Sequence, residues 1–202
     1  MKLTAEQIQE NWKTFLSYID SYISQPRANE LTVFYNKYAE RIMMMPASHK
    51  KEYHNAFPGG YVEHVNRVIK AALKINDVWE EFGVDKNYTV EELVFSAMNH
   101  DLGKMGDEEN ESYIPQTDQW RRDKLGEFYT INPLLGNSLS HSQRSIRILS
   151  QFNIEMSEDE HLAILHHAML NCEENKYISF SKNKMLRITN IADSWSAFVD
   201  EV

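Results

Sequence analysis

Apolar residues recur every three or four positions through most of the chain, which is the period of an amphipathic helix. The first run covers residues 8–23; it follows Thr4-x-x-Gln7, which has the form of a capping box, and Pro26 ends it. A second run covers residues 31–45 and ends at a proline. No alternating run suggests a strand, so the pattern predicts an all-α fold.

The same period continues through the second part of the chain. Further helices are expected over residues 61–82, 89–101, 137–152, 157–167 and 184–199. Thr89-x-x-Glu92 and Ser157-x-x-Glu160 have the form of capping boxes at the starts of two of them. Residues 105–136 are less regular and read as an insert, either a lid over a site or a solvated surface loop. We therefore predict a single-domain helical bundle. Residues 1–50 form an N-terminal helical extension packed on the core, and residues 51–202 form a metal-binding helical domain with the insert at about 105–136.

Composition and charge narrow the function classes. The chain has 202 residues, enough for one domain with its own core, and a formal net charge of −9. An acidic surface argues against long nucleic acid as a partner, because such binding needs basic tracks. The single cysteine, Cys172, cannot form an internal disulfide, and no apolar run of membrane-spanning length is present. These features predict a cytoplasmic protein with no membrane partner and leave a homo-oligomer open.

Histidine and aspartate residues mark the chemistry. His100-Asp101-Leu102-Gly103-Lys104 stands at the end of an apolar helical run. Further candidates, each on its own predicted helix, are His64, His141, the His166-His167 pair and Asp193. Imidazole and carboxylate suit Fe, Mn, Co, Ni or Zn, and helices can bring such side chains together in a bundle core. The sequence therefore predicts a divalent transition-metal site. We favour His166 over His167 as the ligand of that pair, and we set aside His49, His54 and His161.

This order of residues resembles the HD-domain superfamily of metal-dependent phosphohydrolases, over roughly residues 54–200. Gly59-Gly60-Tyr61-Val62-Glu63-His64 is similar to the segment that supplies the family's first histidine, His100-Asp101 to its signature pair, and Asp193 to its closing aspartate. The resemblance implies an HD-type fold and a two-ion, six-ligand centre in which Asp101 bridges the ions. It also implies hydrolysis of a phosphomonoester or phosphodiester bond by a metal-bound hydroxide.

Several cations stand where they could hold the phosphate of a small substrate, which the resemblance suggests is a nucleotide. Lys104 is the first candidate, with a further role in stabilising charge during the reaction. The others are Arg144 and the insert cluster Arg121, Arg122 and Lys124. Two alternatives stay open: a mixed-valent di-iron oxygenase of the same superfamily, which uses the same ligand pattern, and a nucleotide-binding HD protein without catalysis.

Overall fold

The computed structural model describes residues 3–50, 52–136, 139–168 and 181–200, and these parts are mainly helical. Its α-helices are α1 (Ala5–Tyr22), α2 (Arg27–Lys37), α3 (Ala39–Met44), α4 (Gly60–Glu81), α5 (Val90–Asn99), α6 (His141–Gln151), α7 (Glu158–His166) and α9 (Lys184–Trp195). Short helical turns complete the set: the 3₁₀ turn η1 (Leu102–Met105) and the π-helical turns η2 (Arg121–Leu125) and η3 (Ser196–Asp200).

Capping boxes fix the starts of several helices. The three boxes expected from the sequence form as predicted, at Thr4, Thr89 and Ser157. A fourth box at Ser140 explains why α6 begins at His141, four residues after the expected start at 137. In each box a side-chain oxygen accepts a hydrogen bond from an otherwise unpaired backbone N–H of the first turn.

Two sequence predictions need correction. The single helix expected over residues 31–45 is interrupted at Tyr38, and its parts are α2 and α3. Residues 113–115 and 129–131 pair as antiparallel strands β1 (Tyr113–Pro115) and β2 (Tyr129–Ile131), so the fold is mainly α and not strictly all-α. Strands of three residues are too short to show the alternation by which strands are recognised.

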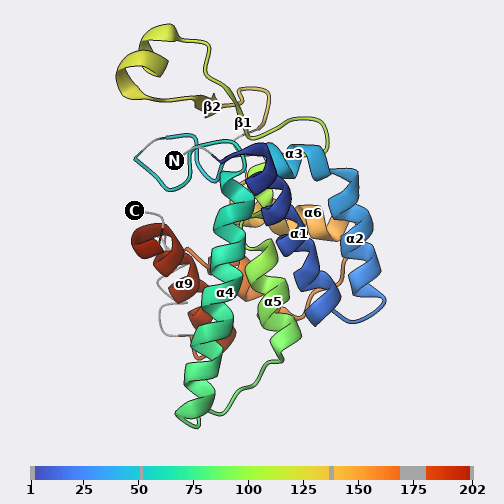
Figure 1. Cartoon of the computed structure of the whole chain (residues 1–202). Coiled ribbons are helices and arrows are strands. Elements are labelled where there is room, and N and C mark those ends of the chain that lie inside the picture. Colours follow the sequence, from blue (N-terminus) through green and yellow to red (C-terminus); the bar gives the residue numbers. More distant parts are fainter. Residues whose placement is uncertain (1–2, 51, 137–138, 169–180, 201–202) are drawn as a thin grey trace.

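The helices pack around α4. In Figure 1, α4 runs through the middle of the bundle, with α1 and α5 on one side and α9 on the other, and these three contact it directly. One continuous hydrophobic cluster joins the N-terminal helices to the rest, from Phe15 and Leu31 to Ile188. The β1–β2 arm projects beyond the bundle at the N-terminal end of α4 (Figure 1). Among the described helices, none combines the length and apolarity needed to cross a membrane.

The N-terminal helices also support the segment that carries the His-Asp pair. Tyr35 on α2 is fully buried, with its ring edge-on to Phe15 at 4.8 Å between centroids. Its hydroxyl donates a 2.7 Å hydrogen bond to Asn99 Oδ1, directly before His100. Residues 1–50 therefore help to hold the end of α5 in place.

Candidate metal centre

Six of the predicted side chains meet in the interior of the bundle. His64 comes from the second turn of α4 and Asp193 from α9, while the remaining four lie at the ends of helices. These are His100 and Asp101 after α5, His141 at the first position of α6, and His167 just after α7. The backbone changes direction where a helix ends, so the side chains of the adjacent residues 100 and 101 can both face the centre.

The first half of the cluster contains two imidazoles and two carboxylates. His64 Nε2 lies 3.2 Å from Asp193 Oδ1 and 3.7 Å from Asp101 Oδ2. His100 Nε2 lies 3.4 Å from His64 Nε2, 3.5 Å from Asp101 Oδ2 and 3.8 Å from Asp193 Oδ1. Ligand atoms at about 2.0–2.2 Å from one ion are roughly 3.0–3.5 Å apart when they are neighbours in its coordination shell. The observed separations are close to that range.

The second half is built on the other oxygen of the same carboxylate. Asp101 Oδ1 lies 3.3 Å from His141 Nε2 and 3.5 Å from His167 Nε2. Although it is buried, this oxygen makes no hydrogen bond within the described part of the chain. An unsatisfied carboxylate oxygen costs free energy in the interior. A cation between Asp101 and the two imidazoles would remove that cost, so the residues present fit a bound metal ion.

Backbone carbonyls orient two of the imidazoles. His100 Nδ1 lies 2.7 Å from Ala97 O, and His167 Nδ1 lies 2.8 Å from Ile164 O. A carbonyl oxygen only accepts, so each Nδ1 must carry the proton in this contact. In the neutral ring, Nε2 is then left with its lone pair directed into the cluster, as a metal ligand requires.

The charges of the cluster favour a cation. Burial raises the pKa of Asp101, but the Lys104 ammonium and His100 outweigh it and hold that pKa well below its usual value. For Asp193, burial is likewise outweighed, by the hydrogen bond from His64 and the nearby imidazoles, so its pKa is lowered. Burial lowers the pKa of His141 to about 4. At neutral pH the centre therefore offers two carboxylates and a neutral His141.

The pKa of His167 shifts in the opposite direction to that of His141. Burial alone would lower its pKa, but the negative charge of the Asp101 carboxylate, whose Oδ1 lies 3.5 Å from His167 Nε2, raises that pKa above the usual histidine value. The His167 proton and a metal ion therefore compete for the same Nε2 atom.

Lys104 lies inside the centre. Its Nζ is 2.5 Å from Asp101 Oδ2, with both side chains almost completely buried. Burial lowers the pKa of Lys104, but the Asp101 carboxylate outweighs burial and raises this pKa above its usual value, so the ammonium stays charged. The structure thus places the ammonium on a candidate ligand carboxylate.

Gly103 explains how α6 reaches the His-Asp turn. A Cβ at Gly103 would lie 1.9 Å from His141 O and 2.7 Å from Ser145 N, so only glycine allows this approach. Ser145 Oγ accepts a 2.7 Å hydrogen bond from Gly103 N and lies 3.2 Å from His100 O. Ser145 is a positioning residue that sequence reasoning missed. Its only signal in the sequence is its place one turn after His141.

The predicted phosphate-binding arginines are not brought into the cluster. Arg144 donates to the carbonyls of Gly103, Gly136 and Leu139, at 3.2–3.5 Å, and so holds backbone segments together. Arg121 pairs with Glu127 at 2.9 Å on the projecting arm. The exposed residues Arg122 and Lys124 lie with it on η2, at the outer end of that arm (Figure 1).

For two histidines, His166 and His54, the positions in the structure differ from the sequence expectation. His166, the favoured member of its pair, is partly buried but contributes to none of the clustered ligand groups among the described residues, whereas His167 does. His54, which sequence reasoning set aside, lies beside His64 with ring centroids 4.5 Å apart. His49 instead stacks on Tyr113, with centroids 5.5 Å apart.

No protein family matches the chain, no curated protein is significantly similar to it, and neither is any solved structure. The geometry therefore carries the interpretation by itself. It establishes a buried His/Asp cluster that could hold a metal ion.

Proposed function

We propose that the chain is a metal-dependent phosphohydrolase of the HD-domain type, acting on a small phosphorylated substrate such as a nucleotide. The observation that carries the proposal is the position of Asp101. One of its oxygens faces His64 and His100, and the other faces His141 and His167. A carboxylate shared in this way suits two neighbouring ions, and paired ions are common in enzymes that transfer phosphoryl groups.

Each residue has a defined part in this proposal. His64, His100 and Asp193, with Asp101 Oδ2, would hold one ion, while Asp101 Oδ1, His141 and His167 would hold the other. Bound divalent ions, for which Fe, Mn, Co, Ni and Zn are the candidates, supply Lewis acidity that lowers the pKa of water and stabilises charge on a phosphoryl group. The buried bundle interior limits the access of bulk water and strengthens these electrostatic effects.

Lys104 is the proposed phosphate contact. Its charged ammonium already lies within the cluster, and a lysine side chain has enough freedom to turn from Asp101 to an oxygen of a bound phosphate. Its part is binding and charge stabilisation, because a lysine whose pKa is raised does not give up its proton at neutral pH. A local cation of this kind lets a chain of net charge −9 hold an anionic substrate.

The test is phosphate release from a panel of nucleotides and from a chromogenic phosphodiester, with metal-free protein and with protein reconstituted separately with each candidate ion. We expect turnover only in reconstituted protein, and a loss of several orders of magnitude in Asp101→Asn. Asp77→Asn, an exposed carboxylate on α4, is the matched control and should keep full activity. Near-normal turnover by folded Asp101→Asn would refute the mechanism. Oxygen consumption without phosphate release would refute the proposed reaction.

A further inference from the structure

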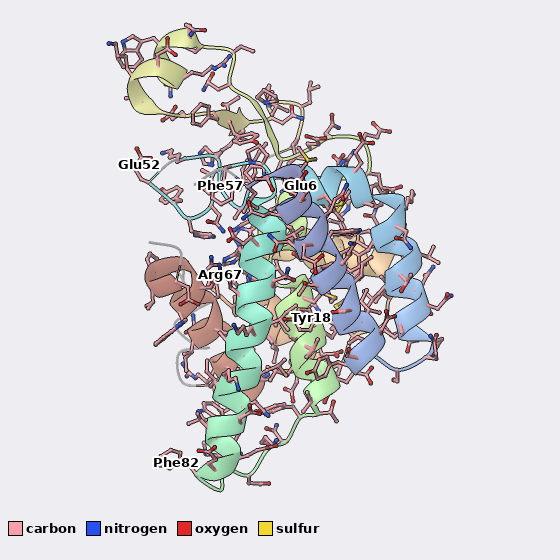
Figure 2. The ribbon with its side chains drawn as sticks, in the orientation of Figure 1. Glu6, Tyr18, Glu52, Phe57, Arg67 and Phe82 are labelled. Atoms are coloured by element: carbon pink, nitrogen blue, oxygen red, sulfur yellow. The ribbon has the colours of Figure 1, made fainter. Side chains whose placement is uncertain are left out.

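The loop between α3 and α4 is held firmly at the end of the bundle. Ala47 N donates to Asn55 O at 3.1 Å, and Gly59 N donates to Met44 O at 3.3 Å. A Cβ at Gly60 would lie 2.2 Å from Asn55 O, so the loop backbone lies directly against the start of α4. Figure 2 shows Phe57 of this loop at the N-terminal end of α4. Residue 54 is therefore carried by a fixed segment.

This segment places His54 against the first half of the metal centre. Its ring lies 4.5 Å from that of His64, tilted by 32°. One ligand atom from each of His54, His64 and Asp101 lies within 4.8 Å of the others, and His54 Nε2 is shielded from solvent. A solvated loop histidine would direct its polar edge outward.

We propose that His54 is a further ligand of the metal centre, donating a ring nitrogen to the ion held by His64 and Asp101. Borderline transition metals accept imidazole readily and often take five or six ligands, more than His64, His100, Asp101 and Asp193 supply. The loop thus adds a ligand from a segment outside the six-residue pattern. This inference rests on the metal centre of the proposed function.

A packing role for His54 is the competing explanation, and substitutions separate the two. His54→Ala removes both the ring and its nitrogens. His54→Phe keeps an aromatic ring that can lie against His64 but has no nitrogen to donate. His49→Ala is the matched control, because His49 belongs to the same loop but stacks on Tyr113 and not on His64.

The measurement is the affinity of each purified full-length protein for Co²⁺, by competition with a chelator, together with the visible absorption spectrum of the bound ion. We expect His54→Ala and His54→Phe alike to weaken one bound Co²⁺ by at least about tenfold and to change its spectrum. His49→Ala should match the wild type in both. The spectrum reports ligands directly, so it does not depend on catalysis.

Several outcomes would overturn the inference. If His54→Phe binds Co²⁺ with wild-type affinity and spectrum, His54 is a packing residue. If His49→Ala loses as much affinity as the His54 variants, the loop as a whole is needed and the assignment to His54 falls. If wild-type protein binds no ion, the centre itself is absent, and the proposed function falls with it.

Discussion

Replacing Lys104 by methionine should destabilise the metal-free protein far more than the metal-bound protein. Methionine retains an unbranched apolar side chain but removes the ammonium that lies 2.5 Å from Asp101 Oδ2. In the metal-free variant the Asp101 carboxylate remains buried without its nearest full positive charge. Removing one partner of a buried ion pair costs about 3–5 kcal/mol.

Bound ions change this result because they supply the positive charge that the substitution removes. The cost should then fall to about 1 kcal/mol, the size of an ordinary substitution. By linkage, saturating metal should stabilise Lys104→Met by roughly 2–4 kcal/mol more than it stabilises the wild type.

The pH dependence of the metal-free difference follows from the signs of the shifts. The lowered pKa of Asp101 gives stability that is present above the unfolded value, about 3.9, and lost as pH falls through the folded value. The raised pKa of Lys104 gives stability that is present below about 10.4 and lost as pH rises through the folded value. Neither of these two groups titrates near neutral pH, but His167 does, and its positive charge beside Asp101 is lost as pH rises through its raised folded pKa. The cost of Lys104→Met should therefore increase as pH rises through the folded pKa of His167.

Urea unfolding with a chelator, and again with saturating Mn²⁺, measures both quantities. Asp101→Asn and the double variant complete a cycle that isolates the interaction of the two side chains. Equal losses with and without Mn²⁺ would refute the reasoning, because Lys104 would then stabilise the fold independently of the charge at the centre. No loss in the metal-free protein would show that the ion pair contributes nothing.

Three further results are expected. Below the raised pKa of His167, metal affinity should rise with pH by about tenfold per pH unit for each proton displaced, because an ion must displace the proton that Asp101 stabilises on His167, and affinity should level off above that pKa. Calorimetry in two buffers measures the released protons, and an affinity independent of pH would contradict this. Arg27→Met should lower the free energy of unfolding in urea by about 3–5 kcal/mol, because it leaves the buried Glu160 carboxylate without the guanidinium that lies 2.6 Å from it. Glu160→Gln should lower the free energy of unfolding much less, and equal losses in the two variants would contradict this explanation. Gly103→Ala should lower the melting temperature and the number of bound ions, because its methyl group would overlap His141 O; an unchanged ion count would mean that α6 can shift without losing its ligand.

Several helix starts were predictable because their signal is local. The capping boxes at Thr4, Thr89 and Ser157 need only residues three positions apart, and each forms as expected. The pairing of β1 with β2 joins segments separated by the η2 turn, so the local pattern could not show it.

The candidate ligands, too, were partly predictable from the sequence and partly dependent on the three-dimensional structure. Their order along the chain singled out the residues, but the choice within the His166-His167 pair depends on how α7 ends and turns about its axis. The helix finishes at His166, and the ring of His167 is the one held by Ile164 O and turned inward. His54 carried no periodic signal because it lies in a loop. From the sequence, Arg144 was expected to hold a phosphate, but in the structure its guanidinium donates hydrogen bonds to backbone carbonyls, which the sequence could not show.

The most direct test of the metal centre is the anomalous diffraction of crystals grown from protein reconstituted with Mn²⁺ or Zn²⁺. We predict one anomalous peak among His64, His100, Asp101 and Asp193, and a second between Asp101, His141 and His167. Each peak should lie about 2.0–2.3 Å from its ligand atoms. Ordered side chains with no anomalous peak inside this cluster, or peaks only at surface residues, would contradict the account.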